Sequence, residues 1–137
     1  MPRPSADVLQ ILISDLNGNV KKADGTPVEV RAGWITSDAE VPIVTVSKIG
    51  EWCKVIDVNG MAKTVYADFA VNLWAITYQD IYAMVESCEQ TLRNVRKAHQ
   101  DVGVVYMVDV DSKRIYEKDI SPVLQREQII VRAYWYE

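Results

Sequence analysis

Residues that commonly do chemistry are few in this chain. It contains one histidine, His99, and two cysteines, Cys53 and Cys88. His99 falls at the end of an expected helix beside Lys97 and Asp101, and no nucleophile motif is present. A helix-end charge that complements the helix dipole explains His99 better than a catalytic role, and a buried, inert thiol explains Cys88 better than a nucleophile. We therefore expect no catalytic residue and no enzyme activity.

Candidate ligands for metals and phosphates are equally sparse. Asp109 and Asp111 form a D-x-D pair that could bind a hard cation, but no calcium-loop glycine and terminal glutamate follow. We interpret the pair as acidic side chains at a strand end. The cysteines lie too far apart for a paired metal-ligand motif, and the six glycines match no phosphate-binding loop. We expect no metal and no cofactor.

Length and charge limit the class of protein. The 137 residues, 49% hydrophobic and 25% charged, are typical of a single globular domain spanning residues 1–137. The net charge of −4 argues against a basic nucleic-acid footprint. The sequence has no apolar run long enough to span a membrane and no apolar stretch of a secretory signal near Met1. We expect a reducing, intracellular setting and no membrane partner.

Two segments have the apolar spacing of amphipathic helices. The first begins near Ser5, a possible cap, and ends around Gly18. The second runs from Gln79 to His99, with Thr77 as its cap. We expect its apolar stripe to pack on a sheet; the stripe consists of Ile81, Met84, Val85, Cys88, Leu92 and Val95.

The other regular segments alternate with a period of two, which is typical of strands. Before the second helix we expect four of them: Val28 to Trp34, Pro42 to Val46, Trp52 to Val58, and Met61 to Ala75. After it we expect three: Val104 to Val110, Arg114 to Tyr116, and Arg126 to Tyr136, with a turn at Asp111 to Lys113.

The predicted fold class is α+β, with a mainly antiparallel mixed sheet and two helices packed on it. Asn59-Gly60 is a strong hairpin signal. The strand after it covers fifteen residues, which is long for a strand, so we expect a bulge or a projecting arm.

Aromatic residues concentrate on the expected strands. They could fill the core, or they could form a protein–protein surface, where Trp and Tyr are enriched. Stacking on nucleic acid is less favoured because only Arg126 and Arg132 lie near the C-terminal aromatic residues. Tyr134, Trp135 and Tyr136 alternate between faces, so some of them must face a partner or solvent.

The order of these segments resembles that of tail terminator (tail-completion) proteins of tailed viruses. The resemblance covers most of the chain and is one of pattern. Its segments are Val8 to Leu16, Pro27 to Arg31, Val41 to Val46, Phe69 to Ala75, Tyr78 to Tyr82, and Ile129 to Trp135. The long hairpin around Asn59-Gly60 departs from the pattern and could be an arm that clasps a neighbouring subunit.

The resemblance implies a virion structural protein that forms a ring, usually a hexamer, at the head-proximal end of the tail. Such a ring ends tail-tube polymerisation and joins the tail to the head. Implied partners are the tail tube protein and neck or connector proteins, with DNA passing through without specific binding. Assembly would occur in the host cytoplasm.

Two alternatives stay open: a small ferredoxin-like binding or regulatory module, and a neck adaptor protein. For a ring, we predict subunit-interface residues among the aromatic side chains and the hairpin tip. They are Trp52, Asn59, Gly60, Trp74, Tyr134 and Tyr136.

Overall fold

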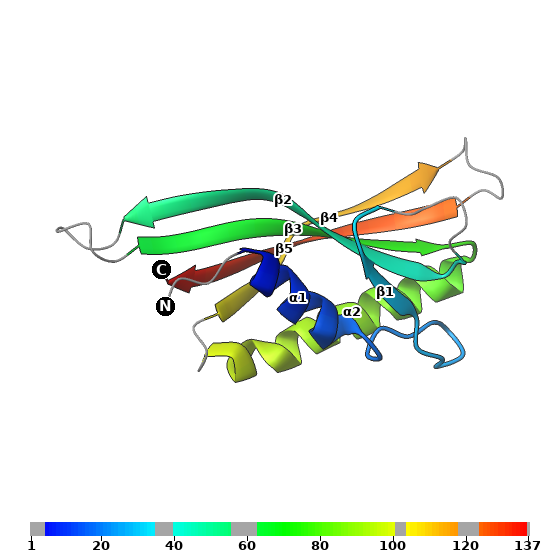
Figure 1. The fold of residues 1–137 in the computed structure, drawn as a ribbon. Helices are drawn as coiled ribbons and strands as arrows, with labels where there is room; N and C mark the ends of the chain where they lie inside the picture. The colour runs from blue at the N-terminus through cyan, green and yellow to red at the C-terminus, as the bar shows by residue number, and fades with distance from the viewer. Residues whose placement is uncertain (1–4, 35–39, 56–62, 101–103, 118–123, 137) are drawn as a thin grey trace.

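In a computed structural model, the described part of the chain folds into one five-stranded sheet with two helices on one face (Figure 1). The structure describes residues 5–34, 40–55, 63–100, 104–117 and 124–136. In chain order the elements are α1 (Ser5–Leu16), β1 (Glu29–Ala32), β2 (Ile43–Val55), β3 (Lys63–Ala75), α2 (Tyr78–Gln100), β4 (Val104–Glu117) and β5 (Leu124–Tyr136).

The strands lie in the order β1-β2-β3-β5-β4. β1 pairs with β2 in parallel, and every other neighbouring pair is antiparallel. The predicted fold class is therefore confirmed: α+β, with a mainly antiparallel mixed sheet and two helices packed on it. β5 lies between β3 and β4, so β3, α2 and β4 form a β-α-β unit split by an antiparallel strand.

Two predicted strand divisions are wrong. The segments Pro42 to Val46 and Trp52 to Val58 were expected as separate strands, but β2 is continuous over Ile43–Val55. β3 pairs with β2 along its whole length, and a bulge between Lys48 and Gly50 absorbs the irregular part of the sequence. The expected bulge therefore lies on β2, opposite the long strand rather than within it.

The predicted turn at Asp111 to Lys113 is also wrong, because β4 runs unbroken over Val104–Glu117. Its pairing with β5 continues past those residues, with one register irregularity between Met107 and Asp111. Three strands therefore precede α2 and two follow it, in place of the expected four and three. The Asn59-Gly60 turn lies outside the described residues.

The core lies between the two helices and one face of the sheet. Ile81, Met84, Cys88 and Leu92 of α2 are fully buried, and Val85 is partly buried against the same cluster. They join alternate residues of β3 in that cluster, namely Val65, Ala67, Phe69, Val71, Leu73 and Ala75. The predicted packing of the helix stripe on this strand face is confirmed for these five residues of α2, and the side chain of the sixth, Val95, is outside the described part. Thr77 caps α2 by accepting a 3.3 Å hydrogen bond from the Asp80 N–H.

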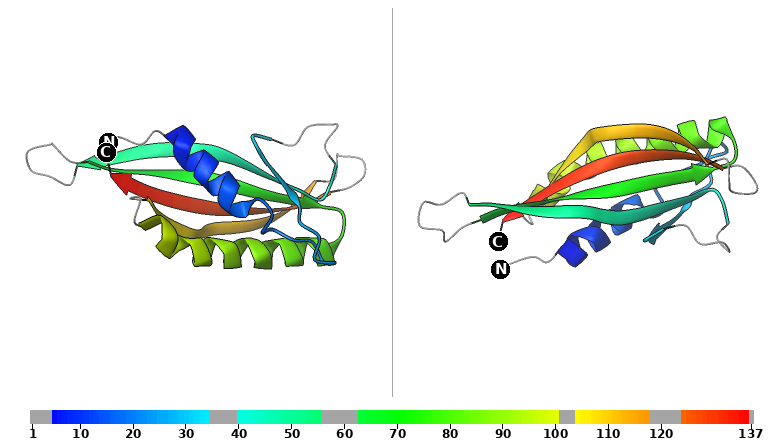
Figure 2. Two further views of the ribbon diagram at one scale, coloured as in Figure 1. Left: turned by 60° about the horizontal axis from the view of Figure 1, so that its bottom comes forward. Right: turned by 90° about the horizontal axis from the view of Figure 1, so that it is seen from above.

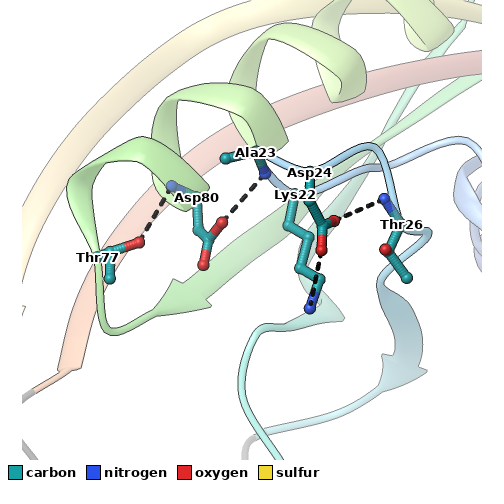
Figure 3. A network of polar contacts seen from close by, with 6 residues as sticks. All are labelled: Lys22, Ala23, Asp24, Thr26, Thr77 and Asp80. Carbon is teal, nitrogen blue, oxygen red and sulfur yellow. Dashed lines mark hydrogen bonds and ion pairs between the residues drawn. The ribbon is translucent and has the colours of Figure 1, made fainter.

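A polar strap fastens the segment between α1 and β1 to the N-terminal half of α2 (Figure 3). The Ala23 N–H donates to Asp80 Oδ1 at 3.1 Å, and the Lys21 N–H donates to Ser87 Oγ at 2.9 Å. Within the strap, Asp24 Oδ1 accepts the Thr26 N–H at 2.9 Å. These bonds hold α1 and α2 on the same side of the sheet.

The opposite face of the sheet carries no helix (Figure 2). The ends of β2 and β3 that lead into their connection also extend past the helical layer (Figure 1). Among the described residues, this leaves two candidate surfaces for partners. One is the helix-free face, on which Tyr66, Arg132 and Tyr134 are partly exposed while Asn72 and Trp74 are buried. The other is the set of strand ends of β2, β3 and β5 that extend past the helices (Figure 1).

Candidate interaction surface

The uncovered face takes its side chains from alternate positions of β2, β3 and β5, since successive residues of a strand point to opposite sides. We call this set the open face. Its described members on the two inner strands are Tyr66, Asp68, Ala70, Asn72 and Trp74 of β3 and Arg126, Gln128, Ile130, Arg132 and Tyr134 of β5.

An aromatic row crosses three strands near the projecting end of the open face. Trp52 of β2 pairs in register with Tyr66 of β3, which pairs with Tyr134 of β5. The Trp52 and Tyr66 rings stack with centroids 5.2 Å apart and planes 23° apart. Tyr66 and Tyr134 follow at 5.4 Å and 37°. The rings therefore stand side by side across the sheet, and each covers part of its neighbour's face.

Gly50 makes room for the first ring of this row. A Cβ atom at Gly50 would lie 2.7 Å from Cη2 of Trp52, closer than real Cβ contacts allow. The indole therefore lies against the backbone of its own strand. Trp52 still has 44% of its surface exposed, so it is the accessible end of the row.

A bidentate ion pair lies next to the aromatic row. Arg132 Nε donates to Asp68 Oδ1 at 2.7 Å, and Nη2 donates to Oδ2 at 3.0 Å. The guanidinium also lies 4.9 Å from the Tyr66 ring centroid. The hydrogen bonds to Asp68, with a smaller contribution from Tyr134, raise the pKa of Arg132 above its already high ordinary value. This cation therefore stays charged and paired.

A polar centre follows further along β3. The Asn72 side chain is fully buried, and its Oδ1 accepts hydrogen bonds from Arg126 Nη1 at 3.3 Å and Gln128 Nε2 at 3.2 Å. These bonds join β3 to β5 on the side that lacks a helix. The oxygen of the Asn72 amide is therefore satisfied across the strand pair, whereas its buried Nδ2 has no hydrogen-bond partner among the described residues.

A second aromatic cluster occupies the other end of the open face. The Trp34 ring meets the Trp74 ring edge-on, with centroids 5.1 Å apart and planes at 88°. Arg126 Cζ lies 4.9 Å from the Trp34 centroid and 5.1 Å from that of Trp74. Trp74 Nε1 donates to Thr45 Oγ1 at 3.0 Å. Trp34, 56% exposed, thus covers a fully buried Trp74.

The structure places the predicted interface residues unequally. Trp52 and Tyr134 meet in one row, whereas Trp74 is buried inside the chain and is not available to a partner. Trp52 pairs with Tyr66, and Trp74 lies eight residues further along β3. The two tryptophans are therefore separated by about 26 Å along the strand. Tyr136 is the last residue of β5 and pairs with Thr64. The side chain of Tyr136 is outside the described part, and so are residues 59 and 60.

Sequence reasoning missed three residues of this surface: Tyr66, Arg132 and Asp68. Tyr66 and Asp68 have the same parity as Trp74 on β3, which was the available signal for a shared face. Their contacts with Trp52 and Arg132 depend on the register between strands. That register could not be read from one segment alone.

The surface suits a protein partner better than a nucleic acid. Tyr66 has Trp52 on one side and Tyr134 on the other, so its ring is not available to stack on a base. Trp, Tyr and Arg are the residues most enriched at the centres of protein interfaces. Two clusters of these residue types at opposite ends of one open face favour protein contacts.

Of the remaining chemical candidates, only Cys88 has a described side chain. Cys88 is fully buried in the core, as the inert-thiol interpretation predicts. Within the described ranges, no three His, Cys, Asp or Glu residues are grouped closely enough to hold a metal ion. The side chains of His99, Asp109 and Asp111 are outside the described part.

No known protein-family model matches this chain, and no curated protein is significantly similar to it. Among the described residues, neither helix combines the length and apolar character needed to cross a bilayer.

Proposed function

We propose that this chain is the subunit of a ring, a hexamer, at the head-proximal end of the tail of a tailed virus. The ring ends polymerisation of the tail tube and joins the tail to the head. The observation that carries the proposal is the two-sided sheet: helices cover one face, and the open face and projecting strands present Trp, Tyr and Arg clusters.

The fold supports this proposal in two ways. The α+β architecture agrees with the resemblance to tail terminator proteins, whose members are small α+β proteins. The strands β2 and β3 extend past the helical layer, as an arm that reaches a neighbouring subunit would (Figure 1).

The charges suit DNA that passes through without being held. The chain carries a net charge of −4, and on the open face Arg132 is paired with Asp68. A surface with paired charges gives little of the counterion release that drives DNA binding. The binding partners are then proteins: the tail tube protein on one side of the ring and neck or connector proteins on the other, within the virion.

A ferredoxin-like binding module is the competing proposal, and one observation favours it. The split β-α-β unit of β3, α2 and β4 is half of that fold. The described residues contain one such unit, preceded by α1, β1 and β2, whereas a full ferredoxin-like fold interleaves two. A neck adaptor would also be ring-forming, and it differs from a terminator in which proteins it contacts.

Native mass spectrometry and light scattering of the full chain test the proposal. We expect a closed oligomer of defined size whose projections in electron microscopy are rings. Loss of the coding sequence from its virus should give overlong tail tubes and unjoined heads. A strict monomer at high concentration, or normal tails in the virus that lacks the protein, would overturn it.

A further inference from the structure

Two strand edges in this fold have backbone groups that no described strand pairs with. β1 covers the outer side of β2 only from Ile43 to Val46, so residues 50–55 of β2 have a strand on one side alone. β4 is the last strand of the sheet and pairs only with β5. Unpaired edges of this kind are templates for pairing with another chain.

These two edges lie at the same height of the sheet. Following the register across all four long strands, Trp52 is level with Tyr66, Tyr134 and Val105. Gly50 is likewise level with Met107 at the far side, through Asp68 and Arg132. Residues 50–53 of β2 therefore occupy the same level as residues 104–107 of β4.

Both edges also bend at the same level. β2 breaks register between Lys48 and Gly50, next to Phe69 of β3. β4 breaks register between Met107 and Asp111, next to Val131 of β5, and Val131 is the partner of Phe69. A bulge twists an edge away from a flat strand and so discourages random pairing. Because the irregularities of β2 and β4 lie at the same level of the sheet, the two edges can still pair with each other beside it.

The strand directions permit this pairing in a ring. β2 and β5 run one way and β3 and β4 run the other, because each neighbouring pair is antiparallel. When copies are related by a rotation axis that runs roughly along the strands, β4 of one copy lies beside β2 of the next and antiparallel to it. Such a heterologous contact closes into a ring when the rotation from one copy to the next divides a full turn.

We infer that residues 50–53 of β2 in one copy pair, antiparallel, with residues 104–107 of β4 in the next copy, which makes the sheet continuous around the assembly. This inference rests on the proposed ring and specifies its interface. The exposed Trp52, which ends the aromatic row Trp52–Tyr66–Tyr134, lies at this edge, so the partner strand lies directly beside it.

Disulfide trapping tests the pairing, because Cys53 already lies on the β2 edge. In a Cys88→Ala background, one further cysteine is placed on β4 by Val104→Cys, Val105→Cys, Tyr106→Cys or Met107→Cys. Disulfides need Cα atoms within about 7 Å. Within one chain, β2 and β4 are three strand spacings apart, about 14 Å, so every disulfide must join two copies.

We expect at least one of the four variants to give a covalent ladder up to the full ring upon oxidation. Ile115→Cys is the matched control: it lies on the same strand but level with Arg126 and Trp74, where β1 covers β2, and it should give no ladder. A Cys88→Ala chain with Cys53 alone should also stay uncrosslinked. A disulfide between the Cys53 residues of two subunits would form only if β2 of one subunit contacted β2 of the other.

The outcomes separate the two proposals. A native ring with no ladder in any of the four variants, or with Cys53–Cys53 dimers, overturns the edge pairing and leaves the ring standing. A strict monomer by native mass overturns both.

Discussion

Arg132 and Asp68 face each other across the β3–β5 pair and form two parallel hydrogen bonds, of 2.7 and 3.0 Å, on the sheet face that no helix covers. Their side chains are only 28% and 12% exposed. The pair connects the aromatic row to the polar centre. It therefore fixes the shape of the surface that we assign to partner binding.

Removing the cation should destabilise the chain because it leaves the Asp68 carboxylate poorly solvated. For Arg132→Ala we expect a loss of roughly 1–3 kcal/mol in the free energy of unfolding, between the values for exposed and buried pairs. Urea unfolding measures it. Arg132→Lys is the control: it keeps the charge, loses the bidentate geometry and should lose less. Equal losses in the two variants would contradict the role of the paired bonds.

Gly50→Ala should move the Trp52 indole, since the new Cβ would lie 2.7 Å from the ring. The ring is the mobile end of a side chain, so we expect it to swing away from Tyr66 at a cost of about 1 kcal/mol or less. Near-ultraviolet circular dichroism should report the loss of the stacked pair. The same substitution in a Trp52→Ala chain provides the control, where Gly50→Ala should have little effect. A spectral change of similar size there would show that the glycine acts through the backbone instead.

Leu92→Ala should open a cavity between α2 and the sheet, because Leu92 is fully buried in the main core. The expected loss in the free energy of unfolding is about 2–5 kcal/mol. Arg93→Ala changes the next, exposed residue of the same helix and should alter the denaturation midpoint little. An unchanged midpoint for Leu92→Ala would rule out this packing.

The lowered pKa of Asp24 leads to a prediction of how acid weakens the polar strap. Hydrogen bonds from Thr26, with a smaller contribution from Lys22, lower the pKa of Asp24 below the ordinary value of an aspartate. The unfolded chain therefore binds a proton at Asp24 at higher pH than the folded chain does. The stabilisation is present above the unfolded-state pKa and disappears as the pH falls through the folded-state pKa.

Urea unfolding of the wild type and of Asp24→Asn should show this difference at neutral pH and lose it in acid, as the pH falls through the folded-state pKa of Asp24. The effect is small because Asp24 is exposed. A difference in stability that persisted or grew in acid would contradict the assignment.

The periodicity of apolar residues alone identified the helices and the strand that bury one side along their whole length. α1 begins at the predicted Ser5 and ends at Leu16, just before the predicted stop around Gly18. α2 has the predicted cap and, as far as its side chains are described, the predicted stripe, since the buried side of an amphipathic helix recurs every three to four residues. The apolar side of β3 was equally readable, because every second residue from Val65 to Ala75 faces the core. The fold class followed from the order of these segments.

Strand continuity and the open face could not be read in this way. The local sequence around Gly50 and around residues 111–113 suggests interruptions, yet β2 and β4 continue through them because pairing with β3 and β5 supplies hydrogen bonds on either side of each irregularity. In the same way, Trp74 looked like a surface residue by type, and Trp34 and Ile43 bury it.

The sequence by itself thus determined which residues form helices, which alternate as strands and which side of β3 enters the core. Tertiary structure alone decided that Trp52, Tyr66 and Tyr134 form one row and that Arg132 meets Asp68. These contacts join residues on different strands, 14 positions apart for Trp52 and Tyr66 and 64 for Asp68 and Arg132, and only the register between paired strands brings them within a few ångströms. A shift of that register by one residue would send each of these side chains to the opposite face of the sheet.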